Sequence, residues 1–300
     1  METDLKIYTM NRSIAYCLTV LYVVTAASCS PAEDERFDLP VQGQTVFTAD
    51  FTAMTIGHDE TIWKWDSGDE IGVFGSSEGT NERYVLKKSG YGVSEAEFYG
   101  PEVSGEQIFA YYPYLKDFAL SDGKMVFELP SRQIWSRETS VAEQFRNQVT
   151  RAFAFLEDND RLTFGYPQGV LAMELKFIEP SIVKSLILSS ETVNLAGIGY
   201  VSEGFHAEMY QMNLYPIVLD CPDGVQSETD GKLTQFPIVM TAGKYTDLKL
   251  RVEVEGKPSY TCLLPAFEIS HSMSECLDVK TIELKIDGMA FGVISGGDLE

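Results

Sequence analysis

Strict alternation of apolar and polar residues is the feature that most restricts what this chain can fold into. The clearest run, "DLKLRVEVEGK" at residues 247–257, places an apolar side chain at every second position, with charged ones between them. Residues 46–54, 124–130, 172–178 and 282–287 repeat the pattern. Side chains two residues apart share one face of a strand, so each run predicts a strand with one face in a core and the other in water. Such strands are typical of antiparallel sheets packed as sandwiches, and the sequence therefore predicts an all-β fold.

One stretch departs from this pattern and has helical spacing. Apolar residues recur at every fourth position across residues 140–155, beginning with Val141 and ending with Phe153. Ser140 stands just before them and can accept a hydrogen bond at a helix N-terminus. We expect a helix over residues 140–155 and a turn in the polar run at residues 157–161.

The chain of 300 residues is long enough for two domains. Its two halves are alike in length and in expected strands, and we place the boundary near residues 166–169, shortly after the polar turn. The prediction is an N-terminal β-sandwich of residues 45–166 and a C-terminal β-sandwich of residues 167–300.

The first residues have the form of an export signal. An apolar run at residues 14–27 follows the basic residues Lys6 and Arg12. A membrane-spanning helix needs about 20 apolar residues, so this run is too short to span, and no later run in the sequence is longer. We therefore expect residues 1–28 to be a lipoprotein-type signal peptide and the mature chain not to be an integral membrane protein.

A candidate lipidation site follows this signal. Ala26, Ala27 and Ser28 are small enough for a signal peptidase cleft, and Cys29 comes directly after them. Several acyl chains on one cysteine would hold a protein stably at a membrane. Residues 29–44 form the expected acidic tether. Within it, Ser30, Glu33, Asp34 and Glu35 resemble the acidic patch of surface-exposed lipoproteins in gut and oral Gram-negative anaerobes. The prediction is an exported outer-membrane lipoprotein, and the alternative is ordinary cleavage after Ala27 or Ser28 beside an incidental cysteine.

The net charge of −22 excludes one class of partner. Nucleic acids and anionic membrane surfaces attract basic proteins, so neither is an expected partner of the mature chain. Glu2 and Asp4 cancel Lys6 and Arg12, and the mature part therefore carries the whole deficit. A solvated acidic coat is the simplest interpretation.

The sequence offers little support for catalysis or metal binding. The histidines His58, His206 and His271 stand in no triad or metal motif, and Walker A, GxGxxG and CxxC patterns do not occur. With 45 acids, some carboxylates always lie close together, so such pairs carry no signal for glycoside hydrolysis. We expect no enzyme, no catalytic residue, no metal and no cofactor. Cys262 and Cys276 lie in neighbouring expected strands, where a disulfide and two buried free thiols both remain open.

Aromatic residues are the remaining lead to a ligand. Two clusters, "WKW" and "FAYYPY", supply rings on which a sugar could stack. The candidates are Trp63, Trp65, Tyr111, Tyr112 and Tyr114. The alternative is that these rings fill the core and the strand ends, because each buries a large apolar area.

The same clusters belong to a set of motifs that resembles a known family. In order along the chain they are "WKWDSGDEIGVF", "GYGVSEAEFYG", "FAYYPY" and "FELPSRQ". This set resembles the N-terminal domain of the fimbrillin family, and "LTFGYPQGVLAMELKF", "VKSLILSS" and "FPIVMTAGKYTDLKLRVEVEGK" are similar to elements of its second domain. The resemblance covers most of residues 45–286. It implies two transthyretin-like antiparallel β-sandwich domains in tandem, in lipoproteins that build or cap type V pili.

The resemblance also implies a mechanism of assembly. In polymerising members a trypsin-like protease cuts after an arginine beyond the first strand, that strand leaves, and a neighbour's terminal strand fills the groove. Here the first strand is expected at residues 45–54, but no arginine follows it closely. Lys64 is the nearest basic residue, and Arg36 precedes the strand. The apolar stretch at residues 289–294 is the candidate donor strand.

Two classes of function follow. The preferred one is a structural or adhesive pilus subunit in an anchor, tip or accessory position. Its partners would be other subunits joined by strand addition, the outer membrane, and surface glycans or proteins. The alternative is a stand-alone cell-surface glycan-binding lipoprotein on the same fold, since a fold does not fix a function. Exposed rings in the aromatic clusters would favour sugar binding, and buried rings beside an occupied first-strand groove would favour assembly.

Overall fold

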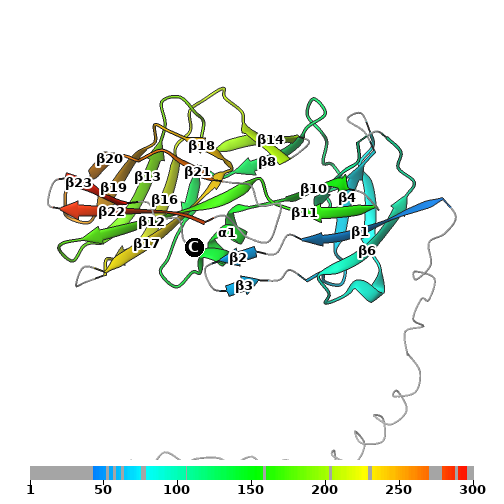
Figure 1. Ribbon diagram of the computed structural model, residues 1–300, viewed down its shortest axis with the longest axis horizontal. Helices are drawn as coiled ribbons and strands as arrows, with labels where there is room; N and C mark the ends of the chain where they lie inside the picture. Colours follow the sequence, from blue (N-terminus) through cyan, green and yellow to red (C-terminus); the bar gives the residue numbers. More distant parts are fainter. Residues whose placement is uncertain are drawn as a thin grey trace, which may run out of the picture. The chain divides into compact units, whose positions relative to one another are not determined.

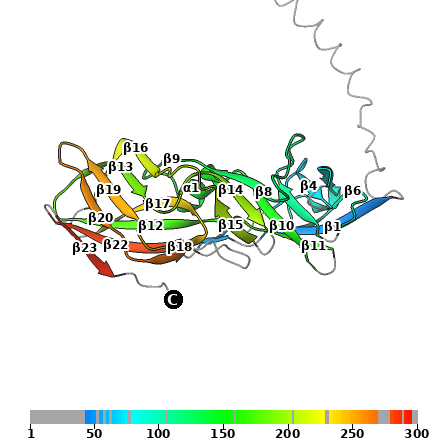
Figure 2. The same ribbon diagram turned by 90° about the horizontal axis from the view of Figure 1, so that it is seen from above.

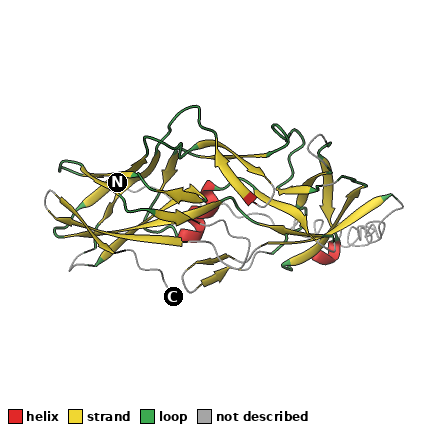
Figure 3. Cartoon of the chain, turned by 45° about the horizontal axis from the view of Figure 1, so that its top comes forward, coloured by secondary structure: helices red, strands yellow, loops and turns green. Residues whose placement is uncertain are grey.

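The structure of the chain is a computed structural model, and its described residues all lie in one compact unit, Pro40–Glu300. The described ranges are 43–51, 54–56, 59–61, 64–75, 79–105, 107–157, 160–202, 205–228, 232–269, 279–287 and 290–295. Strands are the main element of these residues and helices are few and short, so the predicted all-β fold is confirmed (Figure 3).

The first half of the unit is a closed barrel of seven strands. Around the barrel their order is β1, β11, β10, β7, β4, β5 and β6, after which β6 pairs with β1. Their bounds are β1 Gln44–Phe51, β4 Glu70–Phe74, β5 Glu82–Leu86, β6 Glu95–Pro101, β7 Phe109–Tyr112, β10 Ala152–Glu157 and β11 Arg161–Phe164. Closure leaves none of these strands with an open edge along its whole length.

The second half contains a four-stranded and a five-stranded sheet (Figure 1). The first has the order β17 Leu233–Thr241, β12 Gln168–Phe177, β22 Val279–Asp287 and β23 Ala290–Ser295. The second has the order β20 Tyr260–Leu263, β19 Lys249–Val254, β13 Ile182–Ser189, β16 Ile217–Gln226 and β9 Arg132–Ile134. Inward side chains of both sheets, such as Leu171 on β12 and Leu186 on β13, belong to one buried cluster.

The remaining elements are short. A three-stranded sheet has the order β15 His206–Met209, β14 Gly197–Ser202 and β8 Met125–Leu129. Two further pairs are β18 Gly243–Tyr245 with β21 Phe267–Ile269, and β2 Met54–Ile56 with β3 Asp59–Thr61. A 3-10 turn, η2, covers Lys88–Gly90, and the helix α1 covers Val141–Gln148. In the described part of the chain no helix is both long and apolar enough to cross a membrane.

The alternating runs became strands with the expected faces inward. On β19 the alternate residues Leu250, Val252 and Val254 are buried, whereas Lys249 and Arg251 are exposed. The same alternation buries Met125, Phe127 and Leu129 of β8 and Phe47, Ala49 and Phe51 of β1. The strands at residues 279–287 and 290–295 are described in their backbone alone.

The helix begins where the sequence predicts but is shorter than expected. The Ser140 hydroxyl accepts a hydrogen bond from the Glu143 N–H at 3.1 Å, as a helix cap does, but α1 ends at Gln148. Residues 152–157 form β10, so the expectation of a helix to residue 155 was wrong. Phe153 keeps the helical spacing, but it lies between the buried residues Ala152 and Ala154 in a strand of the barrel. There β10 pairs with β7 on one side and with β11 on the other. Tertiary pairing overrode a local helical pattern.

Most of the strand pairs are antiparallel, as predicted, but three are parallel. They are β1 with β11, β12 with β22, and β16 with β9. A parallel pair cannot be joined by a tight turn and therefore needs a long connection. The strands of each of these pairs are far apart in the sequence, so alternation within a strand could not have indicated them.

The change from the barrel to the second group of sheets occurs between Phe164, where β11 ends, and Gln168, where β12 begins. Two earlier segments already belong with the second half, because β8 pairs with β14 and β9 pairs with β16. One buried cluster also joins Phe127 and Phe153 to Leu171 and Phe236. The chain therefore changes sheet between Phe164 and Gln168 without a gap in packing, and the domain boundary near residues 166–169 stays a prediction.

Candidate functional site

The groove occupied by β1 is the candidate functional site, because strand addition would act there. Antiparallel pairing with β6 runs from Gln44 opposite Pro101 to Asp50 opposite Glu95. Parallel pairing with β11 runs from Thr48 opposite Arg161 to Phe51 opposite Phe164. β1 is thus held by backbone pairing on both sides and closes the barrel.

Side chains of β1 fill the barrel interior. Phe47 is 1% exposed and Ala49 is fully buried, and both belong to the barrel core. The Phe51 ring lies 4.9 Å from the Trp65 ring and 5.4 Å from the Phe164 ring, centroid to centroid. Burying a large apolar side chain stabilises a fold by about 1.5–3 kcal/mol. Withdrawal of β1 would therefore expose a continuous apolar slot.

An ion-pair bridge ties β1 to its two neighbours. The Arg161 guanidinium on β11 contacts the carboxylate of Asp50 on β1, and its Nη1 lies 2.9 Å from Glu95 Oε2 on β6. Contact with the two carboxylates raises the pKa of Arg161, chiefly through the hydrogen bond to Asp50. The Arg161 and Glu95 side chains are partly exposed, so this bridge adds orientation more than stability.

Trp65 locks the segment that follows the first strands. Its indole Nε1–H donates to the Ala49 carbonyl of β1 at 3.2 Å. Its backbone N–H donates to the Val93 carbonyl at 3.0 Å, and its carbonyl accepts from the Gly92 N–H at 2.8 Å. The side chain is fully buried. Residue 65 is therefore fixed by its side chain to β1 and by its backbone to the loop before β6.

The candidate processing residue Lys64 precedes this lock. Its side chain is exposed, but the peptide bond after it leads directly into the fixed Trp65. Proteases cleave segments that can open locally, and the bonds of Trp65 oppose such opening. The candidate processing residue Arg36 and the candidate lipidation residue Cys29 lie outside the described residues.

The aromatic candidates for sugar stacking separate into two groups. Trp65 and Tyr111 are fully buried, so neither ring offers a face to a ligand, and the core-filling alternative holds for both. Tyr112 is half-buried and donates its hydroxyl to Asp69 Oδ1 at 2.9 Å, and burial, followed by this bond, raises its pKa. Tyr114 is half-buried, and Trp63 lies outside the described residues.

The candidate donor stretch at residues 289–294 overlaps β23. This strand pairs antiparallel with β22, from Glu283 opposite Ser295 to Asp287 opposite Ala290. β22 in turn lies parallel to β12, and Figure 2 shows β12, β22 and β23 as neighbouring strands near the C-terminus. β23 ends the order of its sheet, so one of its edges is free of strand pairing among the described residues.

Cysteine and histidine chemistry adds little to this site. Cys221 and Cys262 are free thiols, and burial raises the pKa of Cys221 to about 12 and that of Cys262 to about 11. Such thiols stay protonated near neutral pH and react slowly. Cys276, His58 and His271 lie outside the described residues, and His206 is exposed beside Glu208.

Two features of possible function escaped the sequence analysis. One is the lock that Trp65 places on the backbone after β1, which needs the position of a loop 28 residues further on to be known. The other is a surface pocket with two tyrosines, Tyr200 and Tyr210. A signal for it was present in the "SDGK" turn at residues 121–124, because Asp-Gly is typical of a tight hairpin turn.

Comparison with known proteins places the fold. No family model matches the sequence, and no curated protein matches it. Among solved structures the chain is similar to a "putative cell adhesion protein" from Bacteroides ovatus, with 12% identity, a TM-score of 0.51, and 84% of this chain and 95% of that chain covered. At this identity the match shows a common fold.

Two further solved structures are fimbrial proteins. One is the tip fimbrial protein Mfa3 from Porphyromonas gingivalis, with 10% identity, a TM-score of 0.44, and 83% of this chain and 97% of that chain covered. The other is a fimbrial protein from Bacteroides vulgatus, with 11% identity, a TM-score of 0.43, and the same shares of 83% and 97% covered.

Proposed function

We infer that this chain is a fimbrillin-like surface lipoprotein and a structural or adhesive subunit of a type V pilus. It takes an anchor, tip or accessory position, has two transthyretin-like domains in tandem, and carries out no catalysis. The observation that carries the proposal is that β1 fills its groove from both sides while the bond after Lys64 is locked. The motifs that resemble fimbrillins and the fold shared with a cell-adhesion protein support it.

A filled groove allows the subunit to donate a strand but not to accept one. Strand addition needs an acceptor groove on one subunit and a donor strand on the next. A chain that keeps β1 cannot accept a donor at that site, although it can still offer one. Such a subunit ends a polymer or joins it from the side, which is why an anchor, tip or accessory position fits better than the stalk.

β23 is the proposed donor. It is the outermost strand of its sheet and pairs with β22 alone among the described strands. Detaching an edge strand breaks one ladder, whereas detaching β1 breaks two. The C-terminal strand is therefore the easier of the two to release for pairing with a neighbour.

Lipidation at Cys29 is the proposed membrane attachment. The tether between Cys29 and Gln44, where β1 begins, would connect the anchor directly to the barrel. We expect Cys29→Ala to move the protein from the membrane fraction to the soluble fraction on cell fractionation. Membrane association that is unchanged in this variant would count against a lipid anchor.

Trypsin digestion of the purified mature chain tests the retained strand. We expect the bond after Lys64 to survive in the folded protein and the chain to stay monomeric on size-exclusion chromatography. The same digestion above the unfolding temperature is the control, and it should yield a peptide that begins at Trp65. Release of the segment that contains β1 from the folded protein, together with larger oligomers, would support a stalk role instead.

A further inference from the structure

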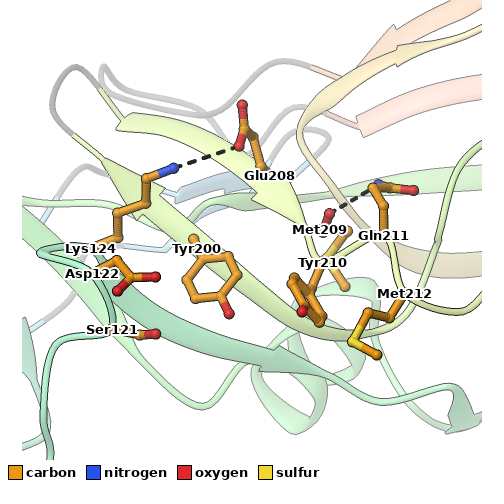
Figure 4. A pocket seen from close by; sticks show the side chains of 9 residues that line it. All are labelled: Ser121, Asp122, Lys124, Tyr200, Glu208, Met209, Tyr210, Gln211 and Met212. Carbon is orange, nitrogen blue, oxygen red and sulfur yellow. Dashed lines mark hydrogen bonds and ion pairs between the residues drawn. The ribbon is translucent and has the colours of Figure 1, made fainter.

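A pocket of about 410 Å³ lies on the outer face of the three-stranded sheet β15-β14-β8, which shares no strand with the barrel. Its lining residues come from the turn before β8, from β14, and from the end of β15 with the loop after it. They are Ser121, Asp122, Lys124, Tyr200, Glu208, Met209, Tyr210, Gln211 and Met212. Figure 4 shows the rings of Tyr200 and Tyr210 between the turn on one side and Met212 on the other.

The register of the sheet explains why the two tyrosines meet. Tyr200 lies opposite Glu208 in the β14–β15 pair, and the Tyr210 N–H donates to the Ile198 carbonyl at 2.8 Å, which extends the ladder. Tyr200 and Tyr210 are therefore diagonal neighbours on one face. Their ring centroids lie 6.0 Å apart at an interplanar angle of 82°. Inward residues of the same strands, such as Val201, are buried, so the tyrosines face outward.

A tight turn brings polar groups to one end of these rings. The Ser121 and Lys124 backbones exchange hydrogen bonds of 3.0 and 2.9 Å, and the two residues between them have positive φ, 49° at Asp122 and 74° at Gly123. Positive φ at both central residues defines a type I′ turn, for which Asp-Gly is a favoured sequence. The turn therefore fixes the backbone positions from which Ser121 and Asp122 present their side chains to the pocket.

The other end of the pocket is held by a buried asparagine. Asn194, 4% exposed, donates from Nδ2 to the Tyr210 carbonyl at 2.7 Å, and its backbone N–H donates to Gln211 Oε1 at 3.0 Å. Its Oδ1 accepts from the Tyr215 N–H at 2.8 Å. These bonds fix the segment that carries Tyr210 and Met212. The pocket is thus formed before any ligand arrives, which reduces the entropy lost on binding.

Groups in the pocket are available for a ligand. Tyr210 is 47% exposed and Met212 is 72% exposed. Within the described part of the chain, neither tyrosine hydroxyl nor the Asp122 carboxylate has a side-chain hydrogen-bond partner. Glu208 lies 3.8 Å from Lys124 Nζ and 3.0 Å from the exposed His206 Nε2. An apolar ring surface beside several convergent donors and acceptors is the form of a ligand site.

We propose that this pocket binds a neutral saccharide. A sugar ring has an apolar face of C–H groups, which fits the exposed Tyr210 ring and Met212, and a rim of hydroxyls, which fits Asp122, Lys124 and Glu208. Two carboxylates against one ammonium, in a chain of net charge −22, disfavour an anionic sugar. The binding goes beyond pilus assembly and uses none of the barrel strands.

Calorimetric titration of the purified mature chain tests the proposal. The neutral probes are lactose, cellobiose and methyl α-mannoside. The anionic comparison is 3′-sialyllactose, which is lactose with a negatively charged sialic acid added. We expect at least one neutral probe to bind with a Kd of about 1 mM or below. Tyr210→Ala should weaken that binding by about tenfold or more, because it removes the stacking surface.

Tyr91→Ala is the matched control. Tyr91 is 43% exposed, close to the 47% of Tyr210, but it precedes β6 of the barrel and does not line the pocket, so binding should change by less than about twofold. The proposal is overturned if no neutral probe binds at about 10 mM, if the two variants behave alike, or if 3′-sialyllactose binds better than lactose. It is also overturned if Tyr210→Ala alters self-association but not sugar binding. Retention of β1 under trypsin is measured separately, so either result stands without the other.

Discussion

The buried residues Trp65 and Trp135 differ in whether the indole N–H has a hydrogen-bond partner. Trp65 Nε1 donates to the Ala49 carbonyl of β1, whereas Trp135 Nε1 has no hydrogen-bond partner among the described residues. Trp65 is fully buried and Trp135 is 6% exposed. The comparison separates the hydrogen bond to β1 from the packing that both rings provide.

We expect Trp65→Phe to lower the free energy of unfolding by about 1–2 kcal/mol more than Trp135→Phe does. Both changes remove a similar volume, but only the first leaves the Ala49 carbonyl without the indole donor. Urea denaturation of the two variants and the native chain measures the difference. Equal losses in both variants would mean that the indole bond to β1 contributes nothing.

At the scale of elements, β1 combines two ladders with a buried face. Phe47 is buried in the barrel core, and its neighbour Thr48 points the other way and is half-buried. A strand with such a face is specified in register, because a slip by one residue would turn every apolar side chain outward.

We expect Phe47→Asp to lower the free energy of unfolding by more than about 3 kcal/mol, because it places an unpaired charge in the core. Thr48→Asn is the matched control on the opposite face, and it should change this energy by less than about 0.5 kcal/mol. Urea denaturation followed by circular dichroism checks both. Similar small effects in the two variants would mean that β1 is not an integral part of the barrel.

A glycine on one barrel strand packs against an aromatic ring on the neighbouring strand. Gly72 on β4 lies opposite Tyr111 on β7, and a Cβ at residue 72 would overlap the Tyr111 ring. The ring cannot easily move, because its hydroxyl oxygen lies 2.9 Å from Leu115 O and 3.0 Å from Asn81 Oδ1, and its one proton is shared between these two acceptors. Gly72, the second glycine of the "GDEIGVF" motif, is therefore required by the packing of the Tyr111 ring on the neighbouring strand.

We expect Gly72→Ala to lower the free energy of unfolding by about 1–3 kcal/mol through overpacking. In the Tyr111→Ala background the same change should cost much less, because the ring that clashes is gone. A double-mutant cycle measured by urea denaturation gives the coupling between the two sites. Additive losses would refute the proposed clash.

Local patterns predicted the strands well because alternation reports on a single strand and its two faces. β8 and β19 were placed correctly on that basis, and Ser140 marked the start of α1. The end of α1 was not predictable, because the pairing of β10 with β7 and β11 decided it. The pocket at Tyr200 was missed for a similar reason, since it depends on β8 pairing with β14 some 70 residues later.

At the scale of the whole molecule, a continuous core joins the two halves of the compact unit. Phe127 and Phe153 from the first half share a cluster with Leu171 and Phe236 from the second. The buried Gln133 also bonds Val239 in both directions, donating at 2.8 Å and accepting at 3.0 Å. The barrel is therefore part of a larger packed body, whereas the inward side chains of β1 belong to the barrel's own core.

Identifying the N-terminal residue of the protein recovered from the cell surface is the most direct test of whether β1 stays in place. Intact-mass and terminal-peptide mass spectrometry would identify the first residue of the mature chain. We expect it to be Cys29, or residue 37 after cleavage at Arg36, so that Gln44–Phe51 remains covalently attached. Chains that begin at Trp65 or later would show that β1 is removed and would contradict a subunit with a permanently filled groove.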